Sequence, residues 1–480
     1  MKLIAIFISL LFISICTAQV KPLIHTYLGD GQRNYYGNVA PSKLNIKWKT
    51  HLGSGFTIVG QKKKFWSGAG WTGQPLVISE NNELFLIQPT LSHYLRKIRA
   101  SDGSIVWSVN LGDVIKGTPT FVETSNRDPE KRFLIVSGSR RGVSCNFFRD
   151  PAYSLHGISY LTGRKLWQHN TVRTHSHSRD VDASGIMVGK KFCIPTENGR
   201  LIYLEPNPSK AKANKSTGIP EPKVHKKYPL FTPNDLHTYK YELSCESSPT
   251  LYKGAIYTAA GVGTVYGHKA GLFGGQKWSF KTGGDLNGSM PLTNDKHLLL
   301  GIEKQYIAGQ GGVMKIKLNA DQGKAEWYYP LKNKQWYEWQ GGLVGSPAVN
   351  HRTAGEMSKS NTSGDLACFV GIDGMLTLVN HKKLTPNKSV WGPMKKQKYP
   401  IPLMLDSVQL PQGSISTPLF IDNKIIIGYD NGMDLYQVTS EQKLQLLDRL
   451  AGPMFDATPT VWNGRIYAAS KNGYLYCLGE

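Results

Sequence analysis

The chain has 480 residues and a formal net charge of +23 at pH 7, with 57 Lys and Arg against 34 Asp and Glu. Its 50 glycines, 23 tyrosines and 11 tryptophans, together with the near absence of helix-forming runs, favour short strands joined by tight turns and exclude a mainly helical protein. The length allows several ordinary domains or one large closed repeat array.

The N-terminal segment decides the expected compartment. An apolar run from Leu3 to Ile15 is followed by Cys16 and Ala18, small residues at the positions that signal peptidase recognises. We expect residues 1–18 to be a signal peptide cleaved near Ala18, which would make the mature chain secreted or periplasmic. Lipid anchoring through Cys16 is the less favoured alternative, because Ile15 is bulky just before the cysteine. No later segment approaches the roughly 20 apolar residues of a transmembrane helix.

The positive charge is spread along the chain, with concentrations at residues 62–64, 210–227 and 395–398. Such a field attracts acidic partners. In an exported compartment an acidic glycan is a candidate partner, whereas nucleic acid is not expected. The alternative is that the charge only keeps the protein soluble.

The cysteines of the mature chain show no Cys-x-x-Cys spacing, so the sequence indicates neither a zinc site nor a dense disulfide framework. We expect one disulfide at most and mainly buried free thiols. These cysteines are Cys145, Cys193, Cys245, Cys368 and Cys477.

An internal repeat organises most of the chain. Each unit opens with small residues and a proline, continues into two apolar strands, and ends with Gly-x-[Leu/Val]-Tyr followed by a Trp. Two clear copies open at residues 247–251 (SSPTL) and 457–461 (ATPTV). Copies this similar predict a repeat architecture in which each unit forms one blade.

Eight openings of the unit can be recognised, and one of them, at Gly185, lacks the proline. Successive openings lie between 41 residues (418 to 459) and 71 residues (347 to 418) apart, which at the short end matches the roughly 40 to 50 residues of propeller repeats. We predict an all-β fold, an eight-bladed β-propeller of four-stranded blades, with seven blades as the alternative. The openings contain Pro75, Pro119, Gly185, Pro249, Pro291, Pro347, Pro418 and Pro459.

The last unit ends at the strand of Cys477, before the tryptophan that ends most other units. The segment 45–51 (NIKWKTH) has the missing outer-strand pattern. We therefore expect a strand near residues 44–52 to pair with the C-terminal blade and complete it, leaving only short, protected edges. Residues 19–480 would then form a single propeller domain, which we expect to be monomeric.

Two blade signatures, residues 100–107 (ASDGSIVW) and 159–167 (SYLTGRKLW), resemble those of the PQQ-like (pyrroloquinoline-quinone-like) β-propeller repeat family, which includes BamB-type and quinoprotein-dehydrogenase-type propellers. The resemblance covers nearly all of the mature chain. It implies the fold but not the function, because these residues specify blades. The resemblance also implies that a quinoprotein would carry two adjacent cysteines beside its cofactor. This chain has no adjacent pair, so we expect no bound PQQ.

Polar residues precede several predicted inner strands, and in a propeller the loops that carry them converge on one mouth of the central channel. His175, His177 and Asp182 combine imidazoles with a carboxylate and could bind a divalent metal, unless they are merely hydrated channel residues. Exposed tryptophans stack on sugars or anchor protein partners, unless they pack between blades. The candidates for ligand or partner binding at this mouth are Trp71, Gln74, Glu246, Asp285, Asp456, Trp336 and Trp339.

The sequence identifies no catalytic residue, because it has neither a nucleophile-elbow motif nor a His-Glu-x-x-His motif. We expect a non-catalytic binding or scaffolding module for a protein or acidic glycan in the envelope or extracellular space. The alternative is an enzyme that uses the channel mouth, either a metal-dependent lyase or hydrolase acting on an acidic glycan or a divergent PQQ-dependent dehydrogenase.

Overall fold

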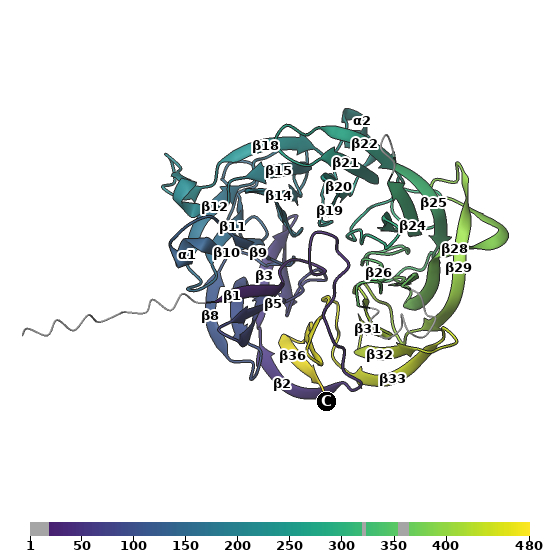
Figure 1. Ribbon diagram of the computed structural model, residues 1–480. Helices are drawn as coiled ribbons and strands as arrows, with labels where there is room; N and C mark the ends of the chain where they lie inside the picture. Colours follow the sequence, from purple (N-terminus) through teal and green to yellow (C-terminus); the bar gives the residue numbers. More distant parts are fainter. Residues whose placement is uncertain (1–18, 319–322, 354–363) are drawn as a thin grey trace, which may run out of the picture.

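The computed structural model describes residues 19–318, 323–353 and 364–480, so the expected signal peptide lies outside the described residues. Antiparallel sheets follow one another around a central axis to form a ring (Figure 1). The prediction of an eight-bladed β-propeller is confirmed. Among the described residues, no helix is long and apolar enough to cross a membrane.

The first four blades each contribute four strands, in order from the channel outwards. Blade 1 contains β5 (Leu76–Glu80), β6 (Glu83–Pro89), β7 (Tyr94–Arg99) and β8 (Ile105–Asn110). Blade 2 contains β9 (Thr120–Glu123), β10 (Phe133–Gly138), β11 (Tyr153–Ser159) and β12 (Lys165–Asn170). Blade 3 contains β13 (Ile186–Val188), β14 (Lys191–Thr196), β15 (Arg200–Leu204) and β18 (Val224–Pro229). Blade 4 contains β19 (Thr250–Tyr252), β20 (Ala255–Ala260), β21 (Thr264–Lys269) and β22 (Gln276–Lys281).

The remaining blades complete the ring. Blade 5 contains β23 (His297–Ile302), β24 (Gly312–Leu318) and β25 (Gly323–Pro330). Blade 6 contains β26 (Ala348–Val349), β27 (Leu366–Val370), β28 (Met375–Trp391) and β29 (Lys398–Gln409). Blade 7 contains β30 (Leu419–Ile421), β31 (Lys424–Tyr429), β32 (Gly432–Val438) and β33 (Leu444–Ala451). Blade 8 contains β34 (Thr460–Trp462), β35 (Arg465–Ala469), β36 (Tyr474–Gly479) and β2 (Asn45–His51).

A few elements lie outside the blade pattern. Blade 5 is three-stranded, because its opening meets the sheet only through an isolated bridge between Leu292 and Leu298. The sheet of blade 1 gains a fifth strand, β1 (Val20–Ile24), beside β5. The other elements are the hairpin of β3 (Ser54–Val59) and β4 (Lys62–Ser67), the pair β16 (Lys212–Ala213) and β17 (Pro220–Glu221), and the short helices α1 (Pro129–Arg132), η1 (Pro208–Lys210) and α2 (Pro233–Thr238).

The outermost strand of blade 8 comes from the N-terminal part of the chain. β2 pairs antiparallel with β36, and Trp48 lies opposite Cys477. The first and last blades of the ring therefore meet beside the C-terminus (Figure 1). All five cysteines of the described chain are free, and all but Cys145 are buried, as the sequence predicts.

Tryptophans on several outer strands join one blade to the next. The Nε1 of Trp107 in blade 1 donates to the carbonyl oxygen of Tyr160 in blade 2 at 3.0 Å. Trp167 in blade 2 donates in the same way to Pro206 in blade 3 at 2.9 Å. Each indole thus buries its ring between sheets while its N–H finds an acceptor. The tryptophan of the repeat signature is a contact between blades.

The small polar residues of five successive unit openings, in blades 3 to 7, form a chain of hydrogen bonds along the channel. The backbone N–H of one opening donates to the side-chain hydroxyl of the next and ties neighbouring openings together. After Ser248 and Ser346 the following residue is a proline, which has no N–H of its own. These bonds run from Ser184 to Ser248 (2.9 Å), Ser248 to Ser289 (2.9 Å), Ser289 to Ser346 (2.8 Å) and Ser346 to Thr417 (2.9 Å).

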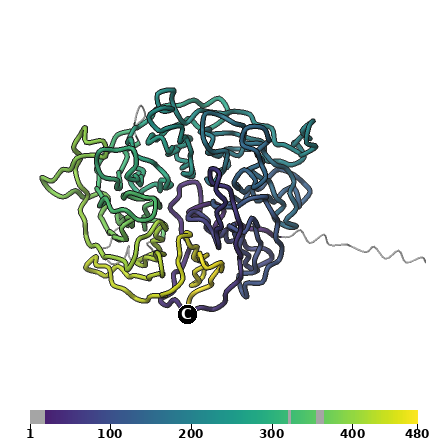
Figure 2. The backbone as a smooth tube through the Cα atoms, turned by 180° about the vertical axis from the view of Figure 1, so that it is seen from behind, coloured from purple at the N-terminus to yellow at the C-terminus, as the bar shows by residue number. Residues whose placement is uncertain are grey.

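The N-terminal segment also fills the centre of the ring, which the sequence did not indicate. Between β1 and β2 the chain crosses the channel (Figures 1 and 2), and we call residues 25–36 the plug. Inner-strand amides donate to its carbonyls, with Leu251 bonded to Gly31 at 2.7 Å. Arg33 of the plug is fully buried and donates to the carbonyls of Pro249 (2.9 Å) and Tyr27 (2.8 Å).

Candidate functional site at the channel mouth

A cavity of about 510 Å³ lies at one mouth of the channel, where the loops that precede the inner strands converge. This volume is in the usual range of small-ligand sites. Its wall combines indole rings, carboxylates and lysines. They are Trp66, Trp71 and Trp339, then Glu246, Asp285, Glu303, Glu338 and Asp456, then Lys116 and Lys471.

The structure brings most of the predicted mouth residues together. Trp71, Glu246, Asp285, Asp456 and Trp339 all line the cavity. They come from loops far apart in the chain, and the ring places them around one space. The loops that precede the inner strands therefore converge on one mouth of the channel.

Gln74 lies elsewhere, because its side chain is fully buried beneath the mouth. Its Oε1 accepts from the backbone N–H of Leu28 in the plug at 2.8 Å, and its Nε2 donates to the carbonyl of Pro459 at 2.7 Å. Both polar atoms of the amide are thus used in holding the plug. Gln74 has a structural role and does not line the cavity.

Trp336 lines a second, adjoining cleft of about 420 Å³ that shares Trp66, Trp339 and Asp456 with the main cavity. The ring of Trp336 stacks on Trp339 with centroids 5.7 Å apart and an interplanar angle of 22°. Both indoles pack against a small apolar cluster that includes Val344. The two tryptophans belong to the mouth and not to a contact between blades.

Asp182 lies beside the cavity in a group of carboxylates. Its oxygens and those of Glu197 and Glu246 lie within 4.8 Å of one another, a spacing that could hold a metal ion. The ammonium of Lys116 ion-pairs with Asp182 and lies 4.0 Å from Glu197. The Lys116 ammonium therefore already lies among these carboxylates, and a metal ion would compete with it.

The two predicted imidazoles do not join Asp182. His175 is exposed. His177 is also exposed, and its Nε2 lies 3.0 Å from the carbonyl of Lys240 while its ring contacts Tyr241 edge-on. The metal group of the sequence prediction is thus divided between the loop surface and the carboxylates beside the cavity.

The carboxylates of the mouth resist ionisation. Burial, helped by the charge of Glu246, raises the pKa of Asp285 to about 7. Burial, helped by the charge of Asp285, raises the pKa of Glu303 to about 9. Burial also raises the pKa of Asp456. Several acids that share one partly dry space cannot all lose their protons at neutral pH.

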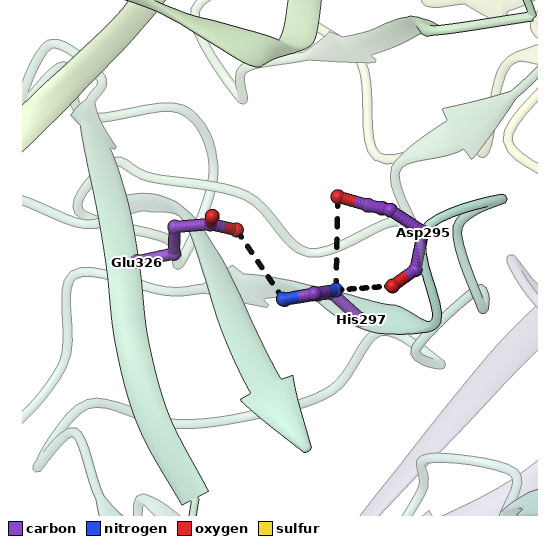
Figure 3. Close-up of side chains that lie close together, drawn as sticks. All are labelled: Asp295, His297 and Glu326. Atoms are coloured by element: carbon purple, nitrogen blue, oxygen red, sulfur yellow. Dashed lines mark hydrogen bonds and ion pairs between the residues drawn. The ribbon is translucent and has the colours of Figure 1, made fainter. Parts of the chain in front are cut away.

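A second group of possible metal ligands lies in blade 5, away from the mouth. His297 sits between Asp295 and Glu326, with nitrogen-to-oxygen distances of 3.6 Å on both sides (Figure 3). The fully buried ammonium of Lys315 donates to Asp295 at 2.6 Å and lies 2.9 Å from Glu326. Although burial opposes it, this ammonium helps to lower the pKa of Asp295 to about 2. Lys315 occupies the cation position, so the group is a structural ion-pair network.

Comparison with known proteins agrees with this architecture. A family model described as outer membrane protein assembly factor BamB matches residues 47–227. The crystal structure of BamB from Moraxella catarrhalis is similar with a TM-score of 0.55 and 14% identity, over 91% of this chain and 100% of that one. The chain folds as a β-propeller and is similar to propellers of the PQQ-like repeat type. No curated protein sequence matches it.

Two further structures resemble this propeller. Quinohemoprotein alcohol dehydrogenase from Comamonas testosteroni has a TM-score of 0.56 and 12% identity, over 96% of this chain and 81% of that one. The computationally designed Ika8 protein has a TM-score of 0.50 and 11% identity, over 86% of this chain and 96% of that one. At these identities the likeness concerns the fold alone.

The mouth of this propeller does not fit a quinone cofactor of the quinoprotein kind. PQQ carries carboxylates, and the cavity wall already has an excess of carboxylates over lysines. No cysteine lines the cavity, and no two cysteines of the chain are adjacent.

The sequence pattern did not indicate several residues of the mouth. Glu303 directly follows β23 and Lys471 lies two residues after β35, and each of these strands runs back toward the mouth beside the opening of its unit. The signal that would have found them is a polar residue directly after the second strand, since antiparallel neighbours end where inner strands begin. Trp66 comes from the inserted β3–β4 hairpin, for which the repeat offers no equivalent position.

Proposed function

We propose that this protein is a non-catalytic, monomeric binding module of the envelope or extracellular space, and that its partner is a protein held at the channel mouth. The observation that carries the proposal is the cavity itself, where three tryptophans and several carboxylates meet above a plugged channel. Protein interfaces concentrate their binding energy in such aromatic anchors. The family description of an outer membrane assembly factor supports a protein partner in an exported compartment.

The aromatic surface continues outside the cavity. Phe65 on the β3–β4 hairpin and Tyr337 on the facing loop are 69% and 64% exposed, and both line the adjoining cleft. Large exposed aromatics that lie together on a monomer mark an interaction surface. A partner segment would cover them while one of its side chains enters the cavity.

The test is affinity capture from the envelope fraction of the producing cell with two matched variants. Trp339→Ala removes an indole from the mouth, whereas Phe273→Ala removes a fully exposed aromatic from the turn between β21 and β22. We expect the wild type and Phe273→Ala to retain the same protein and Trp339→Ala to lose it. Equal retention by all three would show that the mouth is not the binding surface.

An acidic glycan is a second candidate partner for a different surface. Lys62, Lys63 and Lys64 are exposed on β4, and the excess charge of the chain favours polyanions. We expect a uronic-acid polysaccharide to bind the wild type at low salt and to bind a variant with all three lysines changed to Gln less strongly. Unchanged binding by the variant would move the glycan site away from this hairpin.

An enzyme that uses the mouth is the alternative function, and the carboxyls with raised pKa values favour it, because perturbed acids are common at catalytic sites. Elemental analysis and an absorbance spectrum of the purified protein distinguish the two. A stoichiometric metal ion or a quinone band would favour the enzyme, and their absence with intact partner capture would favour the binding module.

A further inference from the structure

The charge of the mouth is opposite to that of the whole chain. The protein has a net charge of +23, yet the cavity is lined by five carboxylates, Glu246, Asp285, Glu303, Glu338 and Asp456, and by two lysines. A concave site of one sign with low-dielectric walls attracts ligands of the other sign. The mouth is therefore suited to a positive group.

The two lysines leave most of these carboxyl groups without an ion pair. Lys116 ion-pairs with Asp182, which is outside the cavity wall. Lys471 lies 3.7 Å from Asp456, whose other carboxylate oxygen is buried without a hydrogen-bond partner although the residue is only 5% exposed. Within the described chain, no ion pair reaches Glu303 or Asp285, and one oxygen of Asp285 also lacks a partner.

The indoles restrict the kind of cation that fits. Trp66, Trp71 and Trp339 line the same cavity as these carboxylates. An indole face attracts an organic cation and also packs against its alkyl stem, whereas it attracts a small hydrated metal ion only weakly. Trp71 lies close to Glu246, which places an acid beside an indole. Aromatic faces with adjacent carboxylates are the recognition chemistry of ammonium and guanidinium groups.

We infer that the mouth cavity binds an alkylammonium or guanidinium group, the head of a lysine or arginine side chain or of a free amine, between its tryptophans and the carboxylates of Asp285, Glu303 and Asp456. This inference rests on the proposed function and names what the partner inserts. The open aromatic cleft beside the cavity favours a side chain carried by a protein, because Phe65 and Tyr337 remain for the rest of the partner to cover.

Binding of such a cation has a signature besides affinity. Asp285 and Glu303 have pKa values of about 7 and about 9. A positive group beside them favours their ionised form, so binding releases protons near pH 7. We therefore expect the affinity to rise between pH 6 and pH 8, and the measured heat to depend on the ionisation enthalpy of the buffer.

The experiment is calorimetric titration of the full mature chain with four probes. The methylamides of N-acetyl-lysine and N-acetyl-arginine represent a partner side chain, 1,5-diaminopentane represents a free amine, and the methylamide of N-acetyl-norleucine is the neutral control. We expect saturable binding of a cationic probe with proton release, and at least tenfold weaker binding of the neutral control. Preference for the amino-acid derivatives over the diamine indicates a protein source, and the reverse order indicates a free amine.

Matched variants complete the test. Asp285→Asn with Glu303→Gln should weaken cation binding at least tenfold and abolish proton release, whereas Glu441→Gln, a fully exposed acid in blade 7, should change neither. Circular dichroism and the thermal midpoint establish that each variant is folded. Equal binding of the neutral probe, or unchanged cation binding by the double variant, would overturn the inference. If no cationic probe binds while Trp339→Ala still loses the captured protein, the cation inference fails and the proposed function stands.

Discussion

The indole ring of Trp48 lies against Gly103, so that a Cβ on this glycine would come within 2.6 Å of the ring atom Cε3. The Nε1 of Trp48 also donates to the carbonyl of Ala100 at 3.2 Å. Trp48 belongs to blade 8 and Gly103 to the outer hairpin of blade 1, so this contact joins the two ends of the ring. Trp107 and Gly163 repeat it between blades 1 and 2.

Gly103→Ala should therefore destabilise the protein more than an ordinary glycine with positive φ. Gly103 has φ +78° with Trp48 against it, whereas Gly254 has φ +69° with nothing within 4 Å. We expect Gly254→Ala to cost about 1–2 kcal/mol for the left-handed backbone, and Gly103→Ala to cost about 1–3 kcal/mol more for the clash. Urea unfolding of both variants measures the difference. Equal costs would mean that the indole moves away freely.

Loss of the Trp48 side chain should weaken the junction between the first and last blades. Trp48→Ala removes a half-buried indole, and we expect a cost of about 3 kcal/mol. Ile46→Ala is the control, because Ile46 lies on the same strand but is 47% exposed, and we expect less than about 1 kcal/mol. Deleting residues 45–51 should lower the thermal midpoint much further. If the deletion melted like the parent, β2 would not be needed to close the ring.

The plug should be essential for stability through Arg33. Arg33→Met leaves the buried carbonyls of Pro249 and Tyr27 without their donor, and we expect a loss of about 3 kcal/mol or more of unfolding free energy. Arg352→Met is the matched control, because its ion pair with Asp30 is partly exposed, and we expect less than about 1 kcal/mol. Hydrogen exchange should also accelerate at the amide of Leu251, which bonds the plug. Protection that survives the substitution would argue against this role.

The mouth carboxyls should make stability depend on pH. Asp285 and Glu303 have folded-state pKa values of about 7 and about 9, above the usual values near 4 in an unfolded chain, so the folded state holds more protons between these limits. Their contribution to stability is therefore lost as the pH rises from about 4 to about 9, by up to about 1.4 kcal/mol per pH unit for each group.

Glu303→Gln tests this dependence, because it removes one titrating group and keeps the shape of the side chain. We expect the variant to gain stability over the wild type at pH 8.5 and to equal it near pH 5, as measured by thermal midpoints across the range. Glu441→Gln should follow the wild-type curve. Parallel curves for Glu303→Gln and the wild type would show that Glu303 titrates normally.

The sequence determined the blade count, because openings of small residues that usually include a proline, and outer-strand tryptophans in most units, follow local rules that recur along the chain. The same rules indicated that β2 has an outer-strand pattern and that Trp71, Glu246, Asp285 and Asp456 precede inner strands. The contact of Trp107 with Tyr160 shows why the tryptophan recurs, because it packs one blade against the next.

Only the tertiary structure decided what fills the channel and what the mouth is made of. The plug has no counterpart in the repeated unit. Its Arg33 donates to the carbonyl of Pro249, which is far away in the sequence. Gln74 looked like a mouth residue, yet its amide is used by Leu28 and Pro459. The acidity of the cavity was hidden beneath a net charge of +23, because a sum over the chain carries no information about which charges face one space.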